Sequence, residues 1–239
     1  MEPDRSIHSI HGYFLRPADV GVPIRYDVER VRDGRGYSNR AVVGYQYDKA
    51  VFSAQASFQV EEEGEDFGSA SPADVPDPES LPSAAEALSG IDSAAAHYWS
   101  HGRSFDMRHV PSPIYVDVAD ERVPSQGVWV RAFDALPDDA ALQRTALAYV
   151  CDYTILEPIL RAHGYAWSDP RLTTASLDHA MWFHRDGSLN DWVLYAQEGL
   201  SARSNRGLTL GRFFDHSGRH LATVAQEGMV RWRPDDTQS

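Results

Sequence analysis

Apolar and polar side chains alternate through most of the first 60 residues, in four short runs. Alternation with a period of two is typical of β-strands that bury one face, and short turn segments separate the runs. The first half is therefore expected to form an antiparallel meander of four strands. The runs cover residues 7–15, 24–31, 37–47 and 51–60.

The second half repeats this pattern after one strand and one helix. Residues 127–133 have the character of a strand. Asp138 and Asp139 suit the positive end of a helix dipole, and apolar residues then recur at helical spacing until Gly164, which predicts one long helix. Four further strands are expected in the segments 172–183, 192–198, 207–214 and 221–232.

The two meanders also share a short motif, which favours an internal duplication. Ser38-Asn39-Arg40 opens the third run of the first half, and Ser204-Asn205-Arg206 precedes the matching run 166 residues later (204 − 38). The connecting segment begins with an acidic stretch and continues rich in Pro and Ser. The predicted organisation is a first unit (1–60), a linker (61–123), a second unit (124–234) and a tail (235–239).

Charge and cysteine content exclude several functional classes. The formal net charge is −13, which opposes binding to nucleic acid or to anionic lipid. Cys151 is the only cysteine, so neither an internal disulfide nor a multi-cysteine metal site can form. No stretch has the roughly 20 apolar residues of a membrane span, and residues 1–5 (MEPDR) do not have the apolar character of a signal peptide. We expect a folded, cytoplasmic protein.

A few polar residues interrupt the apolar patterns. Asp152 lies on the apolar stripe of the predicted helix, where a carboxylate either serves function or bonds to a neighbouring loop, and the pattern leaves both readings open. Simple strand alternation puts Ser176 and Asp178 on one face and His179 on the other. This disfavours a Ser-His-Asp triad, and no metal-ligand spacing is present. Cys151 is expected to be inert packing, and Gln226 to be a strand residue able to position a water.

Four segments together resemble the type II acyl-CoA thioesterases, which are double hot-dog proteins: two curled antiparallel sheets, each wrapped round a helix. The resemblance runs from about residue 6 to residue 232. It implies an α+β double hot-dog fold in which Asp152, Ser176 and Gln226 are the catalytic residues. The segments are residues 8–17 (HSIHGYFLRP), 175–185 (ASLDHAMWFHR), 201–207 (SARSNRG) and 224–228 (VAQEG).

Members of this family carry roughly 50 further residues before the segment that matches His8, and these supply the first strand and helix of the first hot-dog. The first hot-dog of this chain is therefore expected to be partial, with one face of its sheet uncovered. Such a face favours a homo-oligomer, a substitute helix formed by residues 84–88, or aggregation.

The resemblance implies hydrolysis of fatty acyl-CoA to the free acid and coenzyme A. A water held by the three catalytic residues attacks the thioester, and no metal or cofactor is needed. Arg203 and Arg206 are candidates for the phosphates of coenzyme A, with Asp178 and His179 as further candidates for substrate binding. The alternative is a non-catalytic acyl-CoA-binding protein. A dehydratase is less favoured, because the helix carries Asp152 where such enzymes carry a histidine.

Overall fold

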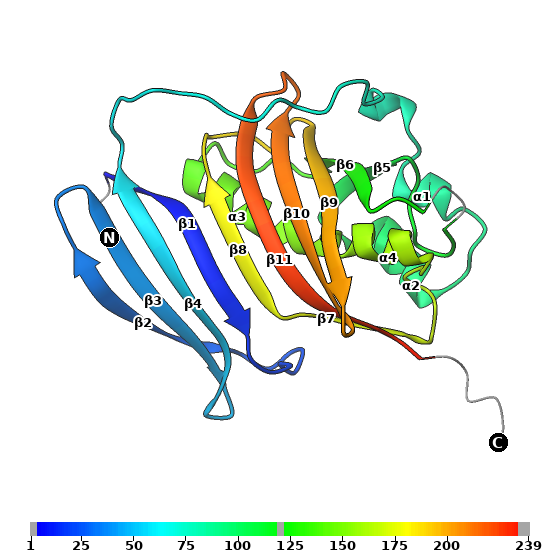
Figure 1. Cartoon of the computed structure of the whole chain (residues 1–239), viewed down its shortest axis with the longest axis horizontal. Coiled ribbons are helices and arrows are strands. Elements are labelled where there is room, and N and C mark those ends of the chain that lie inside the picture. Colours follow the sequence, from blue (N-terminus) through cyan, green and yellow to red (C-terminus); the bar gives the residue numbers. More distant parts are fainter. Residues whose placement is uncertain (1–3, 119–121, 234–239) are drawn as a thin grey trace.

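The computed structural model describes residues 4–118 and 122–233, so the predicted tail (235–239) lies outside the described residues. The eleven strands of these residues join in one antiparallel sheet (Figure 1). The first half supplies four strands in the expected places: β1 (Arg5–Phe14), β2 (Arg25–Asp33), β3 (Tyr37–Gln46) and β4 (Lys49–Val60).

The second half has more strands than the sequence pattern predicts. They are β5 (Phe105–Val110), β6 (Ser125–Ala132), β7 (Leu172–Ser176), β8 (Asp178–Phe183), β9 (Val193–Arg203), β10 (Arg206–Asp215) and β11 (His220–Trp232). β5 falls within the predicted linker but pairs with β6 at the sheet edge, from Phe105↔Ala132 to Val110↔Gly127. The stretch from about residue 61 to residue 77 runs without regular structure.

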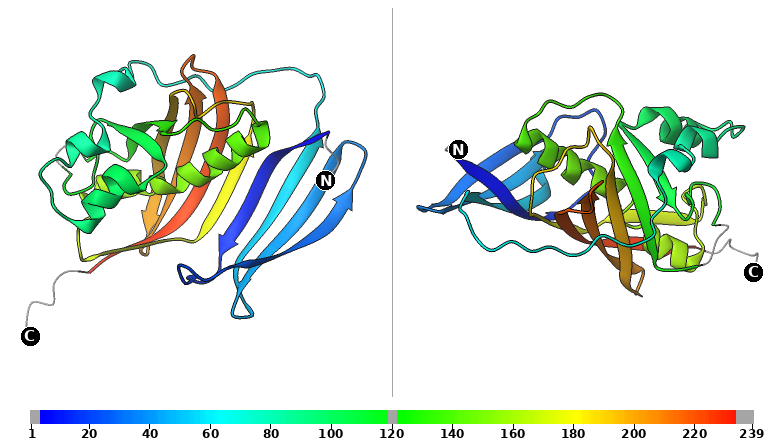
Figure 2. Two further views of the ribbon diagram at one scale, coloured as in Figure 1. Left: turned by 180° about the vertical axis from the view of Figure 1, so that it is seen from behind. Right: turned by 90° about the horizontal axis from the view of Figure 1, so that it is seen from above.

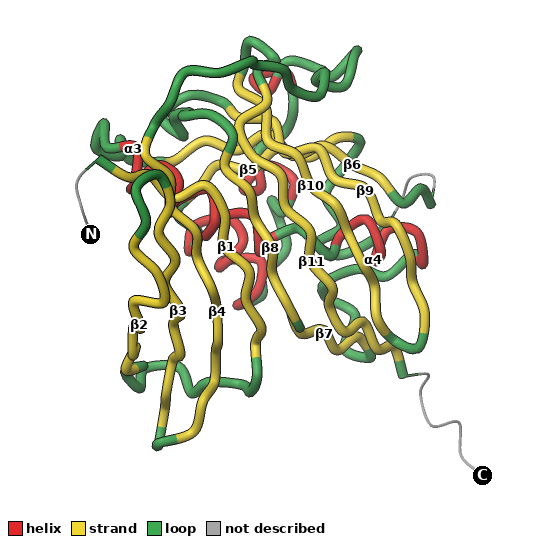
Figure 3. Tube along the Cα trace, turned by 60° about the vertical axis from the view of Figure 1, so that its left-hand side comes forward, coloured by secondary structure: helices red, strands yellow, loops and turns green. Residues whose placement is uncertain are grey.

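The strand order reflects the duplication. The sheet reads β2-β3-β4-β1-β8-β11-β10-β9-β6-β5, so the two meanders follow the same order outward from the β1–β8 junction. This junction is antiparallel and runs from Ser9↔Trp182 to Tyr13↔Asp178. Figure 3 shows the strands of both halves side by side, with the helices on one side of the sheet. The predicted double hot-dog architecture is confirmed.

The long helix predicted for 138–164 is wrong, because the chain forms three pieces there. They are α3 (Ala140–Val150), the 3₁₀ turn η3 (Cys151–Tyr153) and α4 (Glu157–His163). Pro158 explains the break: it has no N–H to donate to the carbonyl of residue 154, and its ring would clash with that carbonyl in a continuous helix. A proline is tolerated in the first turn of a new helix, which is where Pro158 lies.

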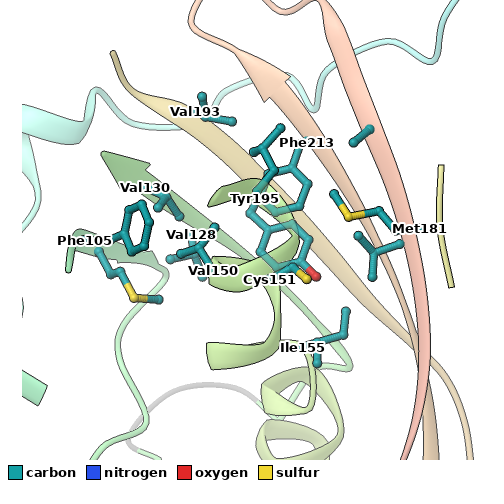
Figure 4. Packing of buried hydrophobic residues seen from close by; sticks show 14 of the residues in the cluster. Phe105, Val128, Val130, Val150, Cys151, Ile155, Met181, Val193, Tyr195 and Phe213 are labelled. Carbon is teal, nitrogen blue, oxygen red and sulfur yellow. The ribbon is translucent and has the colours of Figure 1, made fainter. Parts of the chain in front are cut away.

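The hydrophobic core lies between α3, α4 and the second-half strands (Figure 4). The rings of Tyr195 and Phe213 stack there with centroids 3.9 Å apart. Gly211 is required beneath them, because a Cβ at this position would lie 2.3 Å from the Tyr195 ring. The second half therefore has the tight packing of a complete domain.

The helices α3 and α4 cover the second half of the sheet, and the strands of the first half extend beyond them (Figure 2). Every residue of β2 is exposed, including Tyr26 and Val28. Among the described residues no strand lies beyond β2. The expectation that residues 84–88 form a substitute helix over the first half of the sheet is wrong. The short helix α1 (Ala84–Ala87) contacts β5 and the π-helical turn η2 (Tyr98–Gly102), and Leu88 packs in a separate small cluster with Tyr115.

Two further helical segments complete the described structure, the 3₁₀ turn η1 (Pro78–Ser80) and α2 (Ala94–His97). No helix in residues 4–118 and 122–233 is long and apolar enough to cross a membrane.

Candidate active site

Asp152 is presented at the break between α3 and α4. The helix ends at Val150, so Asp152 lies in η3 and its side chain is exposed, whereas Cys151 beside it is fully buried. From its place on the apolar stripe of a continuous helix, Asp152 is expected to be buried. This prediction is wrong, because the helix α3 ends before Asp152. Ile155 and Leu156, which continue the stripe in the sequence, are buried as predicted.

A β-bulge between β7 and β8 gathers the other site residues on one face. Ser176 of β7 pairs with Gly228, and Ala180 of β8 pairs with Ala225. Three residues (177–179) thus oppose two residues of β11 (226 and 227), and the extra residue resets the alternation of side chains. Ser176 and His179 consequently face the same side as Gln226. The prediction that Ser176 and His179 lie on opposite faces assumed a regular strand and is wrong.

Asp178 serves this bulge. Its Oδ1 accepts a hydrogen bond from the backbone N–H of Glu227 at 2.7 Å. The Leu177 N–H donates to the carbonyl oxygen of Glu227 at 3.0 Å. The two bonds join β11 to the irregular segment. The Asp178 carboxylate therefore stabilises the backbone at the bulge.

The three predicted catalytic residues form one hydrogen-bonded group, called here the Asp152 cluster (Asp152, Ser176 and Gln226). The Ser176 hydroxyl donates to Asp152 Oδ1 at 2.8 Å, and Gln226 Nε2 donates to the same oxygen at 2.7 Å. Gln226 Nε2 also donates to Ser176 Oγ at 2.9 Å. Gln226 is fully buried, whereas Asp152 is exposed. The cluster is therefore buried in the sheet at Gln226 and opens toward solvent at Asp152.

One oxygen of the carboxylate carries this network. Within the described part of the chain, Asp152 Oδ1 accepts both side-chain hydrogen bonds and Oδ2 accepts none. A carboxylate with one oxygen fixed and the other open can hold a water and take a proton from it.

Cys151 is unsuited to nucleophilic chemistry. Burial, and next to it the negative charge of Asp152, raise the pKa of the Cys151 thiol well above its ordinary value. The thiol donates to the carbonyl oxygen of Ala148 at 3.1 Å. The thiolate is the reactive form of cysteine, so this residue stays protonated and unreactive at neutral pH.

The Asp152 cluster borders a cleft of about 950 Å³ between the two halves. The first half contributes an apolar wall that includes Ile10, Phe14 and Phe52, while α3 contributes Ala148 and Tyr149. Burial raises the pKa of the Tyr153 phenol, which also lines the cleft and donates to Tyr149 Oη at 2.9 Å.

Arg16 is the one Arg or Lys side chain among the described residues that line this cleft. It follows β1 and donates to the carbonyl oxygen of Ala50 at 2.6 Å. Arg16 is not among the candidates for phosphate binding that the sequence indicates, although it belongs to the segment 8–17 that carries the family resemblance.

Arg203 and Arg206 do not join this cleft. They pair with each other across the β9–β10 hairpin, and Arg206 Nε lies 3.1 Å from Glu227 Oε1. Their neighbour Gly207 faces Ile159 of α4, on the same side of the sheet as Ser176, so the two arginine side chains point to the opposite side. Their segment of the hairpin borders a smaller pocket of about 250 Å³ with Tyr165 and Trp232.

A buried polar network joins α4 to the sheet behind the site. Glu157 is fully buried and accepts hydrogen bonds from Gln126 Nε2 at 2.7 Å and from Trp167 Nε1 at 2.8 Å, and His109 Nε2 lies 3.1 Å from its Oε2. Burial alone would raise the pKa of Glu157, but His109 and these hydrogen bonds outweigh it and lower the pKa. Gln197 extends the network to Thr154, two residues after Asp152.

No group of three or more His, Cys, Asp or Glu side chains in the described segments is placed to hold a metal ion. The polar residues that line the cleft include Asp152, Ser176, His179 and Arg16.

Comparison with known families finds two matches along the chain. A model described as acyl-CoA thioesterase matches residues 101–229, and one described as the acyl-CoA thioesterase N-terminal domain matches residues 1–59. The two matched segments correspond to the two halves of the sheet, and the irregular connection lies between them.

Individual proteins give the same result over nearly the whole chain. Acyl-CoA thioesterase 2 of Haemophilus influenzae is 32% identical, over 96% of this chain and 81% of its own length. Acyl-coenzyme A thioesterase 8 of the mouse is 35% identical, over 100% of this chain and 77% of its own length. A crystal structure of acyl-CoA thioesterase II TesB2 from Mycobacterium marinum is 36% identical, with a TM-score of 0.80 over 98% of this chain and 83% of that chain.

Proposed function

This chain belongs to the acyl-CoA thioesterase family, and we propose that it hydrolyses fatty acyl-CoA with a water activated by the Asp152 cluster. The observation that carries the proposal is the convergence of Ser176 and Gln226 on a single oxygen of Asp152 at the edge of an apolar cleft. This arrangement leaves the other carboxylate oxygen for a water.

The hydrogen-bonding capacity of the cluster defines how the water is held. Gln226 Nε2 uses both of its hydrogens, one on Asp152 and one on Ser176. Ser176 Oγ donates to Asp152 and keeps one lone pair. A water that donates to Asp152 Oδ2 and to this lone pair keeps an oxygen lone pair for the thioester carbonyl carbon.

The reaction then needs no covalent intermediate. The water oxygen forms the new bond to the carbonyl carbon while Asp152 takes its proton, and collapse of the tetrahedral intermediate breaks the carbon–sulfur bond. Coenzyme A leaves as a thiolate, which is a good leaving group and makes a general acid less necessary. The proton on Asp152 returns to solvent or to the thiolate.

The cleft also suits the two ends of an acyl-CoA. Its apolar wall from the first half offers a surface for the acyl chain. A protein of net charge −13 repels a polyanion unless a local cation binds it, and Arg16 supplies a cation at the cleft. We therefore assign the phosphates of coenzyme A to Arg16, in place of Arg203 and Arg206.

This assignment has a direct test. The variant Arg16→Gln is expected to raise KM for acyl-CoA about tenfold, the scale of a lost charge-assisted hydrogen bond. KM for the matching acyl-pantetheine, which lacks the nucleotide phosphates, is expected to stay the same. Arg203→Gln serves as the matched control and is expected to change neither value. An equal rise in KM for both substrates would show that Arg16 does not bind the phosphates.

The rival function is acyl-CoA binding without hydrolysis. Release of free thiol from acyl-CoA substrates of increasing chain length, followed with a thiol-reactive dye, separates the two. Steady release above the uncatalysed rate supports the thioesterase, whereas tight binding of acyl-CoA without release would establish the rival. We also propose a role in bacterial fatty acid metabolism, a cytoplasmic location and a homo-oligomeric state. Cell fractionation and light scattering test the last two.

A further inference from the structure

His179 stands directly behind the Asp152 cluster and touches it through one member. Its Nδ1 lies 2.7 Å from Gln226 Oε1, on the far side of the amide from Asp152 and Ser176. Its Nε2 lies 4.0 Å from Cys151 Sγ, whose hydrogen is directed to the carbonyl oxygen of Ala148. The bulge at 177–179 is what turns His179 to this face.

The orientation of the Gln226 amide decides whether the cluster holds together. With Nε2 toward Asp152, the amide donates to a carboxylate oxygen at 2.7 Å. With the amide turned by 180°, Oε1 would face that oxygen at the same distance, and two acceptors would repel each other. A fully buried amide with a partner on each side has no water with which to compensate.

We propose that His179 is a positioning residue that fixes this orientation by donating from Nδ1–H to Gln226 Oε1. The inference rests on the proposed hydrolysis by the Asp152 cluster. It replaces the expectation that His179 binds substrate. Donation from Nδ1 requires hydrogen on that atom, so neutral His179 is the Nδ1–H tautomer and its Nε2 is an acceptor.

The experiment compares two variants of His179. His179→Leu removes the donor and is expected to lower kcat about tenfold, the scale of one buried hydrogen bond, with KM changed less than about twofold. His179→Asn places an amide N–H near the position of Nδ1 and is expected to recover kcat to within about threefold of the parent. A substrate-binding role predicts the reverse, a raised KM with kcat unchanged.

A double-mutant cycle tests whether His179 affects kcat through Gln226. In a Gln226→Ala background, His179→Leu has no amide left to orient and is expected to cost less than about twofold in kcat. A full tenfold cost in that background would overturn the proposal, because His179 would then act without Gln226. Circular dichroism melting of each variant identifies losses that come from unfolding.

A readout independent of activity separates this inference from the proposed function. Nitrogen-15 NMR of the His179 ring is expected to report the Nδ1–H tautomer in the parent chain, and a mixed or Nε2–H population in Gln226→Ala. An Nε2–H tautomer in the parent would refute the positioning role even in an active enzyme. The Nδ1–H tautomer in a chain without thiol release would refute the function and leave the hydrogen bond intact.

Discussion

Replacement of Asp152 by Asn tests the proposed general base with little disturbance of the fold. Both side-chain hydrogen bonds to this residue end on Oδ1. An Asn that keeps its carbonyl oxygen in that place retains both, and its NH₂ group replaces only Oδ2. The substitution therefore removes the proton acceptor and leaves the cluster in position.

The size of the effect follows from the role of the lost oxygen. A positioned general base contributes about 10²- to 10⁴-fold, so kcat is expected to fall at least about a hundredfold, equal to about 2.7 kcal/mol in the barrier. Stability is expected to change by less than about 1 kcal/mol, because the side chain is exposed and keeps its hydrogen bonds.

The assay is thiol release under saturating acyl-CoA, with thermal melting followed by circular dichroism. Glu227→Gln is the matched control: it removes a carboxylate from the residue next to Gln226 that faces the other side of the sheet and pairs with Arg206. The control is expected to retain activity. Near-parental turnover in a folded Asp152→Asn variant would refute the mechanism, as would an equal loss in Glu227→Gln.

Three other outcomes follow from the same structure. Ser176→Ala and Gln226→Ala should each reduce kcat, and their losses should fall short of additive because both bind one oxygen; strict additivity would show that they serve different groups. Cys151→Ala should leave kcat within about threefold of the parent, whereas an acyl group trapped on Cys151, seen by intact mass, would replace the water mechanism by a covalent one. Because the folded state lowers the pKa of Glu157, its carboxylate stabilises the fold fully above the unfolded pKa of about 4.3, and this contribution is lost as the pH falls. The stability difference between the parent and Glu157→Gln in urea should therefore narrow as the pH falls below about 4.3, and a difference that stays constant from about pH 7 down to about pH 3 would contradict the buried charge.

Periodicity in the sequence determined the layout of the sheet. Apolar and polar residue types alternate along the strands of each meander, and that local pattern is enough to predict a four-strand meander in each half and their duplication. It also determined which residues to consider in the site, since Asp152, Ser176 and Gln226 stand out either as polar residues in apolar patterns or through motifs shared with a family.

Local pattern was less informative about the connection between the halves. β5 alternates apolar and polar residues only from Phe105 to Arg108, and even the polar Asp106 is buried, so the pattern is too short to predict a strand. Its place in the sheet depends on pairing with β6, the next strand along the chain. Pro158 is a signal for the helix break in the sequence, although the helical spacing of apolar residues alone predicts a continuous helix.

The geometry of the site was decided by tertiary structure. Strand alternation alone puts Ser176 and His179 on opposite faces, and only the pairing of β7 and β8 with β11 creates the bulge that brings them together. Likewise, Arg203 and Arg206 were attractive as cations near a shared motif, but the register of β10 turns them away from Ser176. Sequence specifies the residue types and their periods. Which faces they share depends on the register between strands that are distant in the chain, because a shift of one residue moves every side chain to the other face.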